Sequence, residues 1–358
     1  MKLGMFLEFP VIEGGTEKDA FDDSMILIDQ AERLGVDSLW LAEYHFNPGR
    51  VMASPITILS NVAARTENIR LGTAVILLPL TNPLRVAEEI ATLDLISSGR
   101  VEFGIGRGTF PNVHEGFSSP FDESRGRFDE SLEIILKAWT NETFSFEGDF
   151  YNFGDIIVTP KPYQKPHPPI SVGVTSVESF AATGRMGHNM IINPSRVFTL
   201  TGLKPQIEEY HQAWKDAGHE GSGKVGIRIP IYLSNDAQKA HDEPMESAMF
   251  SMGRLSDRTA RYAGYRGTTG DWGAEAEAMK NMSYDDWLRD KVAYGTPEAV
   301  TDKLQMLIEE LGLDQIMFEV NFGNHIPLDR QLTTIQLMME KVAPNLRQVE
   351  SYEENRVY

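Results

Sequence analysis

The chain has 358 residues, with 33 basic and 52 acidic side chains and a formal net charge of −19 at pH 7. Because it contains no cysteine, disulfides, thiolate metal sites, iron–sulfur clusters and cysteine nucleophiles are excluded. The excess of acidic side chains argues against binding to nucleic acid, which requires clustered Lys and Arg. The longest apolar run, 74–80, is far shorter than the ~20 residues of a membrane helix, and the amino terminus does not resemble a secretory signal. We therefore expect a cytoplasmic protein with no membrane association.

Short apolar segments rich in Val, Ile, Leu and Phe recur along the chain, and each is followed by a segment with helical spacing. Most of the short segments are apolar on both sides of the pleat, as expected for parallel strands covered by helices. The predicted strands cover 2–7, 37–42, 70–77, 100–105, 170–174, 189–192, 225–233 and 315–320. The predicted helices cover 19–34, 55–65, 83–96, 125–139, 177–186, 199–217, 237–249, 297–311 and 332–342.

Four joints between a helix and the next strand contain a glycine, at Gly35, Gly99, Gly187 and Gly312. A glycine at this point permits the left-handed conformation that ends a helix. Eight βα units with such tight return turns predict an α/β protein in which a single domain, 1–358, forms a closed (β/α)₈ TIM barrel. An open doubly wound sheet is the alternative.

Two insertions interrupt the alternation of strands and helices. The first, 141–169, follows the fourth βα unit and contains a predicted hairpin over 144–153, with Gly148 at its tip. The second, 251–295, follows the seventh strand and its helix and is polar and rich in glycine and charge. Long irregular stretches of this kind are usually lids or disordered, so we expect a mobile lid here. A solvated insertion without function is the alternative.

Polar side chains follow the second predicted strand, at Glu43, Tyr44 and His45. Active sites of barrels lie at the C-terminal ends of the strands, and imidazole is the usual proton carrier near neutral pH. His45 and Tyr44 are therefore the candidate catalytic residues. Position alone leaves open that His45 is a hydrogen-bonded structural histidine.

A glycine-rich run surrounds Arg107 after the fourth predicted strand, with Gly104, Gly106 and Gly108 beside it. Glycines allow a bulky ligand to approach the backbone, and an arginine can bind a phosphate through two hydrogen bonds. The run alone also fits a tight bend between strand and loop.

A helix start with several hydroxyl groups follows the fifth predicted strand. Thr175 or Ser176 is the candidate cap and Ser179 lies in the first turn. Arg107 belongs to the neighbouring strand end, and Arg125 lies near the start of the intervening helix. Two arginines that converge on a helix N-terminus predict a site for one phosphate monoester. Ordinary helix capping is the alternative for the hydroxyls.

Other kinds of active site find little support. The eight histidines form no H-E-x-x-H motif and no pair at i and i+4, so we expect no dedicated metal site. The sequence also lacks a G-x-S-x-G nucleophile elbow and a P-loop.

Four blocks of sequence resemble a known family. These blocks, 35–46, 71–79, 83–88 and 99–108, are similar to the bacterial luciferase-like flavin-dependent monooxygenases, and most similar to the luciferase alpha-subunit-like branch. The resemblance extends over nearly the whole chain. It implies a barrel that takes reduced FMN as a co-substrate from a separate NAD(P)H:flavin reductase. It further implies that O₂ is activated as a flavin hydroperoxide to oxygenate a small organic substrate, apolar or carbonyl-containing, and that the chain forms a homodimer through the helices after the second and third strands.

Residues that match the family's functional positions follow from the same resemblance. The phosphate-binding positions of the family correspond here to Arg107, Arg125, Thr175, Ser176 and Ser179. In the luciferase branch a non-proline cis peptide lies beneath the flavin ring, at the place of Ala74 and Val75. The mobile lid of luciferase falls at 251–295.

Three positions depart from luciferase. Tyr44 stands where luciferase has its catalytic histidine, so we do not expect light emission. Gly106 replaces a reactive cysteine beside the flavin, which we expect to open space over the ring, and Thr175 replaces an acidic residue. Two rival functions stay open: a deazaflavin-dependent dehydrogenase or reductase on the same barrel, and a non-catalytic flavin-binding subunit.

Overall fold

The computed structural model describes residues 1–194 and 198–347, so the last part of the predicted domain, 348–358, lies outside the described residues. Within these ranges the chain forms a closed parallel barrel. Its strands pair in the order β1-β2-β3-β5-β8-β9-β10-β12, and β12 pairs with β1 to close the ring. The short β4 continues the line of β3 beside β5. The closed (β/α)₈ barrel is therefore confirmed, and the open sheet is wrong.

The strands of the ring match the predicted apolar segments to within one or two residues. They are β1 (Lys2–Leu7), β2 (Ser38–Leu41), β3 (Arg70–Thr73), β4 (Ile76–Leu77), β5 (Val101–Gly106), β8 (Ile170–Val174), β9 (Asn189–Ile192), β10 (Val225–Leu233) and β12 (Gln315–Glu319). A short strand, β11 (Ala293–Gly295), pairs with the end of β10.

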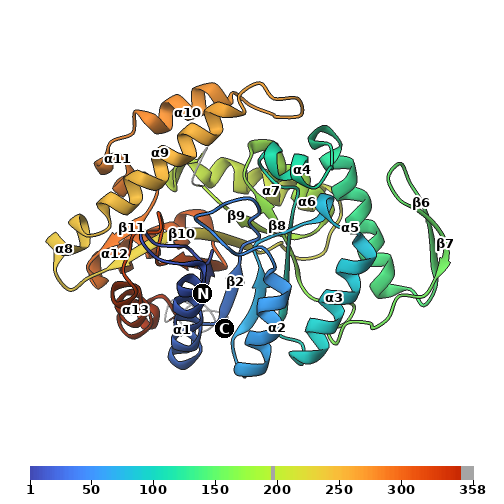
Figure 1. Cartoon of the computed structure of the whole chain (residues 1–358), viewed down its shortest axis with the longest axis horizontal. Helices are drawn as coiled ribbons and strands as arrows, with labels where there is room; N and C mark the ends of the chain where they lie inside the picture. The colour runs from blue at the N-terminus through green and yellow to red at the C-terminus, as the bar shows by residue number, and fades with distance from the viewer. Residues whose placement is uncertain (195–197, 348–358) are drawn as a thin grey trace, which may run out of the picture.

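Helices surround the ring of strands, as Figure 1 shows. They are α1 (Glu17–Leu34), α2 (Pro55–Arg65), α3 (Pro83–Ile96), α5 (Ser124–Thr140), α6 (Val177–Met186), α7 (Lys204–Asp216), α12 (Pro297–Leu311) and α13 (Leu328–Leu337). A shorter helix, α4 (Pro111–Gly116), precedes α5. The remaining turns are the 3₁₀ segments Leu78–Leu80, Phe121–Glu123 and Thr201–Leu203 and the π turn Met338–Val342.

Local sequence explains where these helices begin and end. Thr16 and Asp19 form a reciprocal capping box at the start of α1, and Pro297 follows the cap Thr296 at the start of α12. The four glycines expected at helix ends all have positive φ: 73° at 35, 86° at 99, 70° at 187 and 63° at 312. These turns return the chain to the bottom of the barrel and leave its loops to build the top.

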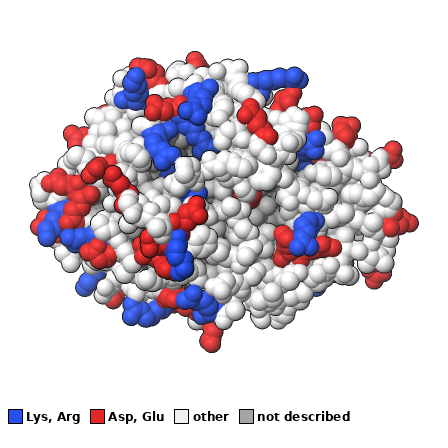
Figure 2. All heavy atoms as spheres, viewed as in Figure 1, with Lys and Arg blue, Asp and Glu red and all other residues white. Residues whose placement is uncertain are grey.

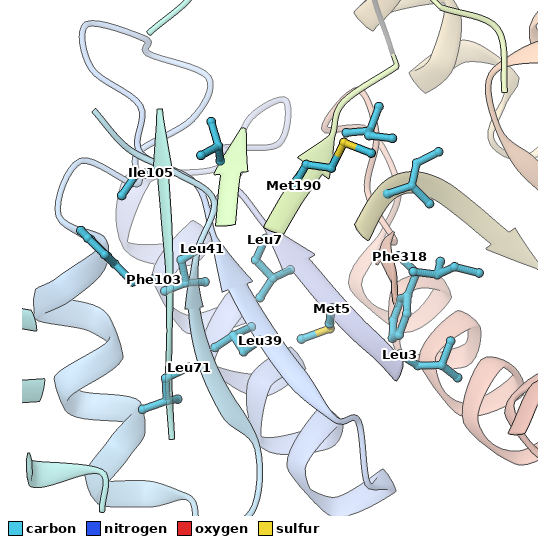
Figure 3. Packing of buried hydrophobic residues seen from close by; sticks show 14 of the residues in the cluster. Leu3, Met5, Leu7, Leu39, Leu41, Leu71, Phe103, Ile105, Met190 and Phe318 are labelled. Carbon is cyan, nitrogen blue, oxygen red and sulfur yellow. The ribbon is translucent and has the colours of Figure 1, made fainter. Parts of the chain in front are cut away.

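Alternate residues of each strand face opposite ways. Leu3, Met5 and Leu7 of β1 are buried against the surrounding helices, beside Leu39 and Leu41 of β2 (Figure 3). This outward layer is the main hydrophobic core. Its burial in a continuous ring is the principal source of stability, because each fully buried side chain contributes about 1.5–3 kcal/mol.

The inside of the barrel is filled chiefly by Trp40, which is 1% exposed. A Cβ at Gly72 would lie 2.4 Å from its ring, and a Cβ at Gly4 would lie 2.8 Å from it, so these positions leave room only for glycine. The indole Nε1 donates to Ser38 Oγ at 2.8 Å. Above the indole, Phe6, Ala42, Ile191 and Met317 complete an inner cluster.

The two insertions differ from each other in how well they were predicted. The hairpin is confirmed, with β6 (Phe144–Glu147) antiparallel to β7 (Asn152–Ile156). The irregular character expected for 251–295 is wrong, because most of it is helical. It contains the larger part of α9 (Met245–Arg261) together with α10 (Trp272–Lys280) and α11 (Tyr284–Asp290), and α8 (Ala237–Asp242) precedes it.

A separate apolar cluster holds this second insertion together. Met252 of α9, Met279 of α10 and Trp287 of α11 pack with Phe322, which follows β12. A narrow apolar stripe on each helix suffices for this cluster, so the overall composition of the segment stays polar and conceals its helices. Among the described residues, no helix has the length and apolar character needed to cross a bilayer.

Candidate active site

A cavity of about 1110 Å³ lies at the C-terminal ends of the strands, between the barrel and α9. Ligand sites usually measure about 300–1,000 Å³, so this cavity has room for a cofactor together with a substrate. All ten residues predicted for the site line it: Tyr44, His45, Ala74, Val75, Gly106, Arg107, Arg125, Thr175, Ser176 and Ser179.

Arg107 and Arg125 lie near the first turn of α6. Arg107 Nη1 donates to Ser124 Oγ at 3.5 Å, and its guanidinium lies 5.3 Å from the ring centre of Phe121. Arg125 follows Ser124 directly on α5. Its charge reaches Glu178 in the first turn of α6. Burial raises the pKa of Glu178, but hydrogen bonds from Thr269 and Ser176 and the charge of Arg125 lower it on balance.

The start of α6 settles which residue caps it. Ser176 is the N-cap and forms a capping box with Ser179, whose Oγ accepts from the Ser176 backbone N–H at 3.3 Å. Thr175 precedes the cap and lines the cavity. The positive end of the α6 dipole, the hydroxyls and the two arginines together favour an anion. We call Arg107, Arg125, Thr175, Ser176 and Ser179 the anion corner.

The floor of the cavity contains the peptide between Ala74 and Val75, which is cis and separates β3 from β4. The side chain of Val75 fills the space beside two glycines. A Cβ at Gly106 would lie 2.4 Å from Val75 Cγ2, and one at Gly173 would lie 3.0 Å from Val75 Cγ1. The expectation that Gly106 opens space is therefore wrong, because the Val75 side chain occupies that space.

His45 is held by Glu43. Its Nε2 lies 2.7 Å from Glu43 Oε1, and Glu43 Oε2 accepts the backbone N–H of Leu77 at 2.9 Å. The rings of Phe46 and Phe117 lie against the imidazole, at centroid distances of 6.1 and 4.7 Å. One carboxylate thus fixes the imidazole and joins the end of β2 to β4 beside the cis peptide.

Tyr44 belongs to a group of buried charges. Its hydroxyl donates to Glu8 Oε1 at 2.7 Å, and Glu8 also forms ion pairs with Arg50 and Arg228. Arg228 Nη2 in turn donates to Glu319 Oε2 at 2.7 Å. Glu8, Arg228 and Glu319 are 3%, 7% and 4% exposed. We call Glu8, Tyr44, Arg50, Arg228 and Glu319 the buried charge network.

Burial and charge shift the proton affinities of the buried charge network in opposite directions. Burial raises the pKa of Glu8, but the charges of Arg50 and Arg228 and the bond from Tyr44 lower it overall. For Glu319, burial outweighs the charge of Arg228 and raises the pKa to about 7. Burial and the negative charge of Glu8 raise the pKa of Tyr44 to about 12, so the phenol stays protonated.

Comparison with known proteins identifies the family. The family of luciferase-like monooxygenases matches residues 1–315. The chain belongs to this family. It is therefore a flavin-dependent oxidoreductase, as the resemblance in the sequence implied.

Relatives match this luciferase-like monooxygenase over nearly its full length. The uncharacterized protein y4wF of Sinorhizobium fredii is 37% identical over 332 residues, 92% of this chain and 93% of that protein. The oxygenase component of the flavin-dependent trigonelline monooxygenase of Acinetobacter baylyi is 29% identical and covers 96% of this chain and 95% of its own. The crystal structure of monooxygenase RslO1 from Streptomyces bottropensis has a TM-score of 0.78 at 29% identity, over 97% of this chain and 100% of that one.

In this luciferase-like monooxygenase, sequence reasoning missed four members of the buried charge network. They are Glu8, Arg50, Arg228 and Glu319. A signal was present, because Arg228 interrupts the apolar run 225–233 and Glu319 ends the apolar run 315–320. Lys, Glu, Arg and Asp are almost never fully buried unless they are paired. Two opposite charges in neighbouring buried strands therefore indicate an ion pair.

The second insertion covers the mouth of the cavity of this luciferase-like monooxygenase. The Arg258 guanidinium of α9 stacks 3.7 Å from the ring centre of Phe110, and Phe110 packs on Trp272 of α10 at 5.9 Å. Arg266 forms an ion pair with Asp122 at 2.7 Å. These contacts attach the insertion to the loop after β5.

Proposed function

We propose that this chain is the oxygenase component of a two-component monooxygenase, which receives reduced FMN from a separate reductase and oxygenates a small organic substrate. The anion corner carries the proposal. It offers two guanidiniums, three hydroxyls and a helix N-terminus to one phosphate monoester, which FMN has. The name of the Acinetobacter baylyi relative, an oxygenase component, supports the separate reductase.

The residues of the cavity fit a flat cofactor with a phosphate tail. Arg107 and Arg125, with the first turn of α6, would bind the phosphate. Val75 would lie under the ring system, because Gly106 and Gly173 admit its side chain. When bound, the flavin supplies the activation of O₂.

His45 and Tyr44 lie on the other side of the floor. Glu43 orients the His45 imidazole through its contact with Nε2. Tyr44 commits its own proton to Glu8, so its phenol oxygen is left as an acceptor toward the cavity. We assign His45 as the residue that holds a proton near the reacting oxygen, and Tyr44 as the residue that orients the substrate beside it.

The helices α9 and α10 would exclude water from the reaction. The contact of α9 with Phe110, and that of Arg266 in the loop between α9 and α10 with Asp122, join this insertion to the loop after β5. Exclusion of water protects reactive oxygen species from hydrolysis and strengthens the electrostatic interactions in the site.

Cofactor binding and O₂ uptake test the proposal. The purified chain is titrated with FMN, oxidised and dithionite-reduced, and with the deazaflavin cofactor F420. Oxygen uptake is then followed with reduced FMN and a panel of small substrates. We expect FMN to bind and O₂ to be consumed. Preference for F420 without O₂ uptake would instead indicate a dehydrogenase. FMN binding without O₂ uptake on any substrate would indicate a non-catalytic subunit.

A further inference from the structure

Three arginines of α9 line the cavity in addition to those of the anion corner: Arg254, Arg258 and Arg261. We call them the arginine wall. Asp257 is the carboxylate that α9 adds to the same lining. Within residues 1–194 and 198–347, no carboxylate lies within 4.0 Å of these three guanidiniums. In a chain with a net charge of −19, such a concentration of positive charge with so little compensation favours an anionic ligand.

Arg258 is held in place by apolar and polar contacts. Its guanidinium lies over Phe110, and its Nη2 lies 3.4 Å from Asn112 Oδ1. Burial lowers its pKa, and the positive charges of Arg50 and Arg254 lower it further. Binding of an anion would relieve this repulsion between neighbouring cations.

The arginine wall and the anion corner are built from different elements of the fold. The anion corner follows β5 and β8, the fourth and fifth strands around the ring. Arg258 belongs to α9, contacts Phe110 and Asn112 in the loop after β5, and also interacts electrostatically with Arg50, which follows β2. The proposed phosphate site uses Arg107 and Arg125, so the three arginines of α9 offer their charge to a second anionic group in the same cavity.

Aromatic side chains surround the arginine wall. Phe110 packs on Tyr262 at 6.3 Å and on Trp272 at 5.9 Å, and the guanidinium of Arg254 lies 5.6 Å from the ring centre of Phe250. All of these aromatic residues line the cavity. Figure 2 shows basic side chains gathered around a hollow beside the position of α9 in Figure 1.

We infer that the substrate is an aromatic carboxylate, whose carboxylate binds the arginine wall and whose ring packs among Phe110, Tyr262 and Trp272. The planar guanidinium matches a carboxylate through two parallel hydrogen bonds. Rings of this kind prefer edge-to-face or offset contacts with another ring. The inference rests on the proposed function for the reaction, but it concerns a separate part of the cavity.

Paired probes that differ only in charge test the inference. Benzoate and phenylacetate, with benzamide and phenylacetamide as neutral partners, are titrated calorimetrically into both FMN-free and FMN-loaded protein. Hydrogen bonds to charged groups are each worth ~1.5–3 kcal/mol, so we expect each anion to bind about tenfold tighter than its amide, or more. The same titrations with hexanoate, which lacks a ring, should give weaker binding than with phenylacetate.

Substitutions in the arginine wall test whether these residues cause the preference for the anion over the amide. Arg254→Gln and Arg258→Gln should reduce the preference for the anion, and the double variant should abolish it, with FMN affinity unchanged. Arg289→Gln is the matched control, because Arg289 is an exposed arginine of α11 that pairs with Asp286 and Asp290. Arg254 is itself exposed, so Arg254→Gln remains informative if Arg258→Gln fails to fold.

Several results would overturn the inference. They are equal affinity for anion and amide, no binding of either at millimolar concentration, or a loss of FMN affinity in the arginine-wall variants as large as the loss of benzoate affinity. The last result would assign the arginine wall to the flavin. If FMN fails to bind while the FMN-free protein still prefers the anions, the proposed function is wrong and this inference stands.

Discussion

The two groups of charge at the mouth of the barrel differ in how their arginines are compensated. In the buried charge network, Arg228 is 7% exposed and pairs with both Glu8 and Glu319. In the anion corner, Arg125 is exposed, and within the described ranges no carboxylate lies within ion-pair distance of it. A cation that the protein already neutralises stabilises structure, whereas a cation that it leaves without a carboxylate is available to a ligand. The comparison separates residues that support the site from residues that bind in it.

Removal of Arg228 should give the largest effect, on stability. Arg228→Met leaves Glu8 and Glu319 buried with one fewer cation, and breaking a buried pair costs about 3–5 kcal/mol. Urea unfolding measures the free energy of unfolding. Arg85→Gln is the control, because Arg85 pairs with Glu89 on the exposed surface of α3 and such pairs contribute ~0–1 kcal/mol. A loss for Arg228→Met no larger than the control would contradict the structural role.

Removal of Arg107 should weaken ligand binding and should change the free energy of unfolding much less. Arg107→Ala should weaken FMN binding about 10- to 100-fold, because a charged hydrogen bond to phosphate is worth ~1.5–3 kcal/mol. Tyr44→Phe removes one hydroxyl on the opposite side of the floor and should change FMN affinity little. Fluorescence titration of FMN measures both. Equal affinities for the two variants would refute the assignment of the phosphate to the anion corner.

The packing of Val75 against Gly106 on the cavity floor can be tested by adding a methyl group at one residue and removing side-chain volume from the other. Gly106→Ala places a methyl group 2.4 Å from Val75 Cγ2, and overpacking of this kind costs about 1–3 kcal/mol. Thermal unfolding should therefore show a destabilised single variant, and FMN should bind more weakly. Adding Val75→Ala should restore both properties. If the double variant is no better than Gly106→Ala, steric conflict with Val75 is not the cause.

The smallest expected effect is a pH dependence from Glu319. Its pKa in the folded protein, about 7, lies above the value of 4.5 for an unperturbed glutamate. Between these pH values the folded state binds the proton more tightly, so the free energy of unfolding should fall as pH rises, by at most ~1.4 kcal/mol per pH unit for one group. Urea unfolding from pH 5 to 8 should show a flatter profile for Glu319→Gln. Parallel profiles would show that Glu319 does not titrate in this range.

Most of the fold could be predicted because it follows from short-range patterns. Apolar segments of strand length and glycines at helix ends are visible in the sequence, and both recur in the structure. The insertion 251–295 could not be predicted in the same way. Its helices bury narrow stripes, such as Met252 and Met279, against each other, and the partner of a stripe is not visible in the sequence.

The candidate site also has one part that could be predicted from the sequence and one part that could not. The anion corner consists of residues at strand ends and one helix start, so sequence motifs and the predicted topology together were sufficient to predict it. The buried charge network joins Glu8, Arg228 and Glu319, which lie up to 311 positions apart in the chain, as the two glutamates show. Similarly, the contact of Gly106 with Val75 depends on how closely two strands approach each other. The sequence shows only that Gly106 has no side chain, and it does not show that Val75 fills the space.

Trp40 gives the barrel a property that its loops do not control. The indole packs with Phe6, Ala42 and Met317, which line the cavity, so a single side chain of β2 supports the lower end of the binding space. A lineage that acquired a smaller residue there would gain a longer tunnel and accept bulkier compounds. Size selectivity and recognition at the rim can therefore evolve through separate mutations.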